Sequence, residues 1–258
     1  NGPTVLFLDV STSTVGDVAS DLGITDEGSH GRGTAILSTG TGAEFGIVAT
    51  NWQDEHRFWV LDMLGTFLDV ASPDLRRPSA ARNVICADFD NCGNEEILIN
   101  NMDQPNRLLK YIDGQWVRID AGDASEPDGC GTGMACCDID GDGRLEVLIS
   151  HGESAMMPLT FLRPLGGYEN NWLRIAPLTR FGAPARGAFV EITVSGRTQK
   201  RIIDGGSGYL CQNEPVAHFG LGTADAVQVV RIVWPGGATH ILMNPDINRI
   251  HRINHPEG

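Results

Sequence analysis

Residues 137–149 read CDIDGDGRLEVLI, a short acidic loop with two glycines that leads directly into an apolar run. Residues 87–99 read ADFDNCGNEEILI, so the pattern also occurs 138 − 88 = 50 positions earlier. A further step of the same size leads to the related stretch ILSTGTGAEFGIV at residues 36–48. Self-similarity at a fixed period of this size indicates a repeat architecture. Residues from about 15 to 165 therefore contain three copies of one unit.

Each unit is predicted to consist of short β-strands separated by turns. In the middle copy, the runs expected to form strands cover residues 83–87, 97–100, 107–111 and 115–119. Four strands in about 50 residues is the size of a β-propeller blade. A helical repeat is the alternative, but the abundance of Val, Ile and Gly disfavours it. The predicted fold is all-β, with a partial β-propeller of about three four-stranded blades.

Three blades are too few to close a ring, because propellers close with about four to eight. An open fan leaves sheet edges that can pair with another chain. We therefore expect the protein to bind a protein partner or to self-associate through blade edges, as a homo-oligomer.

Residues 169–258 are predicted to form a second domain, following a propeller part that covers residues 1–168. Between residues 171 and 243, apolar and polar side chains alternate as they do in half-buried strands. Turn signals such as Ser195-Gly196 and Pro235-Gly236 separate the runs. This pattern favours a small antiparallel β-sandwich or barrel.

The composition excludes some classes of partner. The chain has 33 Asp and Glu residues against 19 Lys and Arg residues, a formal net charge of −14, which argues against nucleic-acid binding. Apolar stretches fall short of the roughly 18 residues needed for a membrane span, so no membrane insertion is expected. The six cysteines lack zinc-type spacing and are either buried thiols or disulfides of unknown pairing.

The loop after residue 137 has the pattern of a calcium site. Alternate residues in a tight loop can turn their carboxylates toward one centre, and hard oxygen ligands of this number select Ca²⁺. Without a cation, these carboxylates would repel one another. The alternative is an acidic hairpin without metal. The predicted ligands are Asp138, Asp140, Asp142, the backbone carbonyl of Arg144, and Glu146.

The loop after residue 87 is a weaker version of the same pattern. Its predicted ligands are Asp88, Asp90, Asn94 and Glu96. Cys92 takes the central acidic position, and a thiol is a poor calcium ligand, so weaker binding and no metal both remain open. In the first copy, Ser38, Gly40, Gly42 and Gly46 stand where carboxylates are needed, and we predict no metal there.

The acidic loops resemble the FG-GAP/VCBS calcium-binding blade repeats, and the motifs that follow resemble the ASPIC/UnbV domain. Those motifs are Asn170-Asn171-Trp172-Leu173-Arg174, Gly187-Ala188, Gly205-Gly206-Ser207-Gly208-Tyr209-Leu210, His218-Phe219-Gly220-Leu221-Gly222 and Trp234-Pro235-Gly236-Gly237. The chain as a whole is similar to the C-terminal part of the cartilage acidic protein family. This resemblance implies a secreted, calcium-binding, propeller-type protein that acts through contacts and has no established enzyme activity.

An extracellular or periplasmic location suits the acidic loops. Calcium is millimolar outside cells, where sites as weak as about 10⁻⁴–10⁻³ M are filled.

The alternative is a small-molecule enzyme with a pocket on the propeller axis near His30 and His151. These histidines and Glu153 occupy matching places in successive repeats, and Ser154 lies beside Glu153. A nucleophile needs an activating base and a suitable turn, and no G-x-S-x-G elbow surrounds Ser154. The non-catalytic interpretation, in which these side chains tie neighbouring blades together, is favoured.

Overall fold

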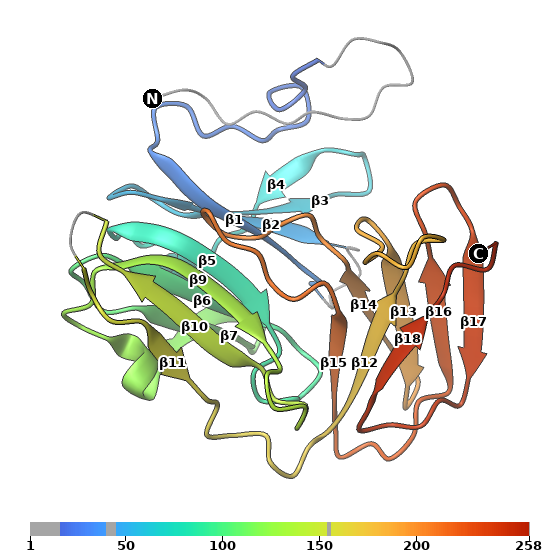
Figure 1. The fold of residues 1–258 in the computed structure, drawn as a ribbon. Helices are drawn as coiled ribbons and strands as arrows, with labels where there is room; N and C mark the ends of the chain where they lie inside the picture. Colours follow the sequence, from blue (N-terminus) through green and yellow to red (C-terminus); the bar gives the residue numbers. More distant parts are fainter. Residues whose placement is uncertain (1–15, 40–44, 154–155, 258) are drawn as a thin grey trace.

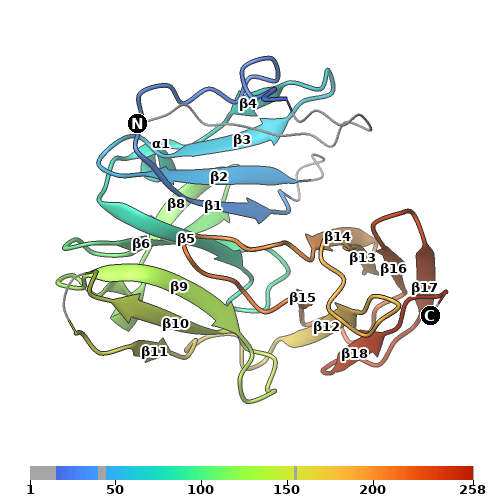
Figure 2. The same ribbon diagram turned by 45° about the horizontal axis from the view of Figure 1, so that its top comes forward.

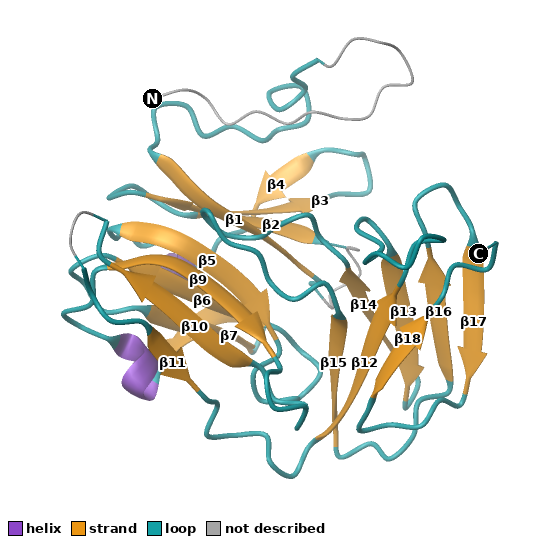
Figure 3. Cartoon of the chain, viewed as in Figure 1, coloured by secondary structure: helices purple, strands orange, loops and turns teal. Residues whose placement is uncertain are grey.

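The computed structural model describes residues 16–39, 45–153 and 156–257, and its elements are almost entirely β-strands (Figure 3). Three sheets form the first part of the chain and two sheets the second (Figure 1). The predicted all-β fold, a partial propeller followed by a sandwich, is confirmed.

Each of the first two blades is a four-stranded antiparallel meander. The first contains β1 (Gly31–Leu37), β2 (Gly46–Asn51), β3 (Arg57–Leu61) and β4 (Phe67–Asp69). The second contains β5 (Ala81–Ala87), β6 (Glu96–Asn101), β7 (Arg107–Ile112) and β8 (Gln115–Ile119). A short helix, α1 (Pro73–Arg76), lies between them and is capped by the Ser72 hydroxyl.

The third blade has three strands in the described part of the chain, one fewer than predicted. Its strands are β9 (Gly131–Cys137), β10 (Glu146–His151) and β11 (Thr160–Leu162). A 3₁₀ turn, η1 (Gly122–Ser125), precedes it. The 50-residue period is kept in the pairing, because Cys86 lies opposite Ile97 and Cys136 lies opposite Val147.

The blades pack face to face through apolar side chains. Ala35, Leu37, Val48 and Phe58 of the first blade pack against Val84, Ile97, Ile99 and Leu109 of the second. Ile85, Ala87 and Leu98 of the second pack against Met134, Cys136, Val147 and Ile149 of the third. Since strand side chains alternate between faces, each blade buries one set against each neighbour.

The second part of the chain is a β-sandwich with one core. One sheet has the order β15-β12-β18 and the other β14-β13-β16-β17. The bounds are β12 (Asn171–Pro177), β13 (Phe189–Val194), β14 (Arg197–Ile202), β15 (Ala217–Gly222), β16 (Val229–Val233), β17 (Thr239–Met243) and β18 (Ile250–Ile253). The pairing is antiparallel as predicted, except that β18 runs parallel to β12.

The segment between β14 and β15 runs along the inner strands β1, β5 and β9 (Figure 2). Gly208 N donates to Thr34 O at 2.7 Å, and Cys136 N donates to Asn213 Oδ1 at 3.1 Å. The inner edges of the fan are therefore covered by the chain itself. The same arrangement brings the acidic loops at the ends of β5 and β9 against the sandwich.

All six cysteines are free thiols. Cys136 is buried between the second and third blades, where it packs as a small apolar side chain.

Candidate metal centre

The third loop is a tight connection between β9 and β10, whose ends pair as Cys137 with Glu146. Gly141 and Gly143 have φ values of +78° and +84°, in the left-handed region that glycine adopts at little cost. Asp138 organises the turn from within, because Oδ1 accepts from Gly141 N at 2.8 Å and Oδ2 accepts from Gly143 N at 3.1 Å.

Three of the four predicted carboxylates converge in this loop. Asp138, Asp140 and Glu146 each place an oxygen within 4.8 Å of the other two. Glu146 Oε2 accepts from Ile139 N at 2.9 Å. Glu146 Oε1 is buried and has no hydrogen-bond partner among the described residues. A buried carboxylate oxygen without a hydrogen bond is costly unless a cation lies against it, and in this structure the Arg163 guanidinium takes that place, with Nε 3.3 Å from Oε1.

The remaining predicted carboxylate, Asp142, faces its neighbour. Its Oδ2 accepts from Arg144 Nε at 3.0 Å. Partial burial acts to raise the pKa of Asp142, but the Arg144 guanidinium prevails and lowers it. Arg144 also lies over the Tyr168 ring, 3.9 Å from its centroid. In this conformation Asp142 therefore pairs with Arg144 and lies outside the three converging carboxylates. Its role as a calcium ligand stays a prediction, as does that of the Arg144 carbonyl.

The donor set of the third loop fits a hard divalent cation. All three converging groups are carboxylates, the ligands that calcium prefers. Arg163 lies at the mouth, with Nη2 2.7 Å from Asp140 Oδ2 and Nε 3.3 Å from Glu146 Oε1. Its side chain is 49% exposed, so it can turn into solvent when an ion enters.

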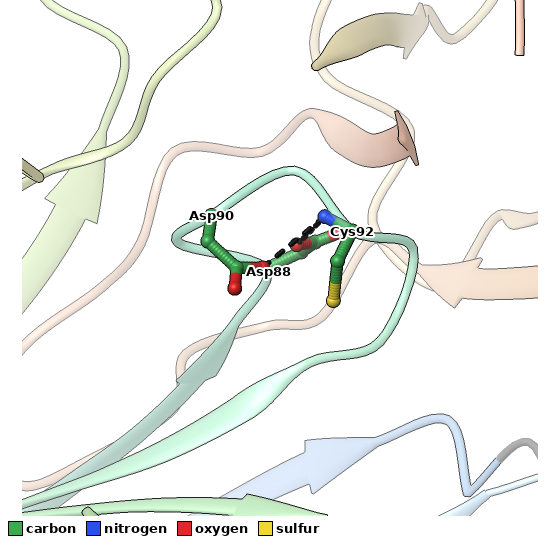
Figure 4. Close-up of side chains that lie close together, drawn as sticks. All are labelled: Asp88, Asp90 and Cys92. Carbon is green, nitrogen blue, oxygen red and sulfur yellow. Dashed lines mark hydrogen bonds between the residues drawn. The ribbon is translucent and has the colours of Figure 1, made fainter. Parts of the chain in front are cut away.

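The second loop gathers a mixed set of groups. Ligand atoms of Asp88, Asp90 and Cys92 lie within 4.8 Å of one another (Figure 4). Cys92 N donates to Asp88 Oδ1 at 2.9 Å and to Asp90 Oδ1 at 3.2 Å. Asn94 turns its Oδ1 to Arg197 Nη2 of the sandwich at 3.4 Å, and its Nδ2 donates to Cys92 Sγ at 3.9 Å, so its side chain offers the cluster a donor in place of a ligand oxygen.

Sequence reasoning missed Lys110, which enters the second loop from β7. Its Nζ is 2.9 Å from Glu96 Oε1 and also contacts Asp90 Oδ2. Burial raises the pKa of Asp88 to about 6. Burial and the neighbouring Asp90 and Asp88 raise the pKa of Glu96 to about 8. Charge in this loop is therefore costly, and a positive group is needed to balance it.

In the first copy, Ser38 N donates to Glu95 Oε2 at 2.8 Å. Gly40 and Gly42 lie outside the described residues, so the expectation of no metal there stays a prediction.

Both acidic loops contact the sandwich through hydrogen bonds. Arg174 Nη1 of β12 donates to Asp138 Oδ2 at 2.8 Å. Gly220 N of β15 donates to Asp88 Oδ2 at 3.0 Å. His218 Nε2 lies 2.6 Å from Asn91 Oδ1. The sequence offered no signal for these contacts, because the partners are 36 to 132 positions apart.

The two histidines of the enzyme alternative each contact groups of their own surroundings. His30 Nδ1 lies 2.8 Å from Asp54 Oδ2. His151 Nε2 lies 3.2 Å from Glu126 Oε2, and its Nδ1 lies 2.9 Å from Pro158 O. Ser154 lies outside the described residues.

Glu153, the fourth group of the enzyme alternative, forms an ion pair with Arg82. A cavity of about 80 Å³ lies between the blades and the sandwich, where Arg174, Arg201 and His218 contribute to its lining, but neither His30 nor His151 does.

Comparisons with known proteins agree with this architecture. The sequence profile of the FG-GAP-like repeat matches residues 88–149, which contain both acidic loops, and that of ASPIC and UnbV matches residues 179–258. Cartilage acidic protein 1 of Mus musculus is 42% identical over 272 residues, covering 100% of this chain and 42% of the mouse protein. The Homo sapiens protein is 42% identical over 271 residues, covering 99% and 41%. The chain thus spans about two fifths of the length of the curated relatives it matches.

Proposed function

This chain belongs to the cartilage acidic protein family, and on that premise we propose that it is a secreted, calcium-binding, non-catalytic interaction protein of the extracellular space. The observation that carries the calcium assignment is the convergence of Asp138, Asp140 and Glu146, whose buried Oε1 makes no hydrogen bond and meets the half-exposed Arg163 side chain at 3.3 Å. The name of the relatives supports the extracellular location. In the part of the chain that the structure describes, no helix is long and apolar enough to cross a membrane.

The role of the ion follows from where its ligands lie. Glu146 begins β10, and Asp138 immediately follows β9, so one cation ties the two strand ends together. It also neutralises carboxylates that would otherwise repel one another. The ion therefore stabilises the third blade.

Calorimetric titration and thermal unfolding of the protein in calcium and in chelator test this role. A bound ligand raises stability by about 2.7 kcal/mol at a hundredfold excess over its dissociation constant. Asp140→Asn removes a ligand whose side chain is partly exposed, and we expect it to abolish most of this gain. Asp246→Asn, in an exposed ion pair on the sandwich, is the matched control. Equal unfolding temperatures of the unaltered protein in both buffers would refute the calcium role.

The interaction surface that we assign is the outer face of the third blade. In the second blade, the cross-strand pair Leu98 and Leu108 packs beneath the third blade. Their counterparts Leu148 and Phe161 also pair across strands but are 42% and 48% exposed. A repeat position that is covered in one blade is thus open in the next.

A second copy of this chain is the occupant that we propose for this face. The opposite end of the fan is already covered, because Ala19 and Ile24 pack on the first blade against Ala49 and Trp59. A head-to-tail contact of blade one on blade three is thereby obstructed. A two-fold contact of one third-blade face with another remains, which is the symmetry of most homodimers.

A further inference from the structure

We propose that the ammonium group of Lys110 is a built-in cation of the second acidic loop, so that only the third loop takes up a divalent ion. This inference rests on the calcium role proposed above for the third loop. The new element is that Lys110 determines how many calcium ions the two acidic loops bind.

Strand pairing delivers Lys110 to the site. Ile97 of β6 lies opposite Leu109 of β7. Continuing this antiparallel register by one residue sets Glu96 opposite Lys110. The Lys110 Nζ lies 2.9 Å from Glu96 Oε1 and 3.6 Å from Cys92 Sγ, and it forms an ion pair with Asp90. The ammonium group thus lies against three of the groups that would surround a metal ion.

The third loop has the same register with a different basic residue. Val147 lies opposite Leu162, so the next position sets Glu146 opposite Arg163. The Lys110 side chain is 25% exposed and that of Arg163 is 49% exposed. A lysine ammonium is a compact point charge that can enter a ring of carboxylates, whereas a planar guanidinium is held at the rim.

The aligned ligand positions of the two loops differ by one carboxylate. In the third loop they hold Asp138, Asp140, Asp142 and Glu146. In the second they hold Asp88, Asp90 and Glu96, with Cys92 where the third has Asp142, while a further carboxylate, Glu95, faces Arg201 of the sandwich. The second loop therefore has one hard oxygen ligand fewer, which weakens it for calcium. A monovalent side-chain cation suits its three ligand carboxylates.

A consequence is that the second loop is ordered at any calcium concentration. Its contacts with the sandwich, from Asp88 to Gly220 and from Asn91 to His218, then persist in chelator. Only the contacts of the third loop respond to the ion.

Replacement of Lys110 tests the proposal through the number of calcium ions bound, measured by calorimetric titration. The unaltered protein should bind one ion, and Lys110→Met should bind two, because three carboxylates lose their internal cation. Lys200→Met is the matched control, since Lys200 on β14 is the other lysine of the chain, and it should bind one. Two ions in the unaltered protein, or one in Lys110→Met, would overturn the proposal.

A second background separates this proposal from the calcium role of the third loop. In Asp140→Asn/Glu146→Gln, the third loop is disabled, so an ion bound after adding Lys110→Met belongs to the second loop. One ion there supports the built-in cation even if the unaltered protein binds none. No ion there overturns it even if the unaltered protein binds one.

Acylation of lysine amines in the unaltered protein, measured by mass spectrometry, tests the proposal without relying on a variant. The rate at Lys110 should be the same in calcium and in chelator. A severalfold faster reaction in calcium would mean that the ion displaces Lys110, and would overturn the proposal.

Discussion

Arg174 of the sandwich and Asp138 of the third loop form a buried ion pair, with Nη1 2.8 Å from Oδ2 and side chains 5% and 0% exposed. Arg174 also pairs with Glu214, whose Oε2 accepts from Asp138 N at 3.3 Å. A carboxylate of the candidate calcium site is thus shared between the propeller and the sandwich. The ion and Arg174 therefore both compensate the charge of Asp138, so each is expected to matter more for stability when the other is absent.

Arg174→Met should destabilise the protein more in chelator than in calcium. Removing one partner of a buried pair leaves an uncompensated charge, at a cost of about 3–5 kcal/mol. A bound calcium ion would compensate Asp138 and reduce that cost. Urea unfolding in both buffers measures the difference. Arg249→Met, which breaks a pair with Asp246 that is 58% and 77% exposed, should have little effect in either. Equal losses for Arg174→Met in both buffers would contradict the coupling.

Gly143→Ala should cost far more stability than Gly141→Ala. Both glycines have positive φ, so each substitution carries a backbone cost of about 1–2 kcal/mol. A Cβ at Gly143 would meet Trp172 Cε2 at 1.9 Å, whereas a Cβ at Gly141 meets nothing within 4 Å. The clash should add about 1–3 kcal/mol. Chemical unfolding followed by tryptophan fluorescence provides the comparison, and similar losses at the two sites would show that the loop does not pack on Trp172.

Stability should fall as the pH falls from about 6.5 to 4, in part because of His56. Burial, reinforced by Arg107, lowers the pKa of His56 from 6.5 to about 4. In the unfolded chain the imidazole takes up a proton below about 6.5, while in the folded protein it stays neutral until about 4. The folded state therefore loses about 3 kcal/mol relative to the unfolded state across this window.

His56→Asn isolates this contribution from that of the carboxylates. His56 Nδ1 accepts from Asn51 N at 3.1 Å, and one repeat later Asn106 Oδ1 accepts from Asn101 N at 2.8 Å. Asparagine is therefore the residue that the repeat itself uses at this position. Unfolding in urea at pH 7 and at pH 4 should show a smaller acid loss in the variant. The same loss in both proteins would exclude His56 as its source.

Leu148→Lys should convert the proposed dimer into a monomer without lowering the unfolding temperature. The side chain is 42% exposed at the centre of the third-blade face, so a charge there opposes association and leaves the core intact. Ile241→Lys is the control, because Ile241 is 57% exposed on a strand of the sandwich. Light-scattering mass during gel filtration measures the state, and a monomeric unaltered protein at high concentration would exclude self-association through this face.

The repeat arithmetic predicted more of the fold than of the site. The 50-residue period placed the acidic loops and their strands correctly, because a blade is built from local antiparallel pairs. It overestimated the third blade, whose outermost described strand is β11. It did not reveal that residues between β14 and β15 cover the inner edges, because that contact joins distant parts of the chain.

The sequence by itself determined the repeat, the two acidic loops and the position where Cys92 replaces a carboxylate, since each is a matter of local spacing. Only the tertiary structure decided what balances those charges. Lys110 is 20 positions from Asp90, and Arg174 is 36 positions from Asp138. Such groups meet through strand register and domain packing, and because electrostatic energies depend on distance and burial, the chemistry of the loops follows from the fold.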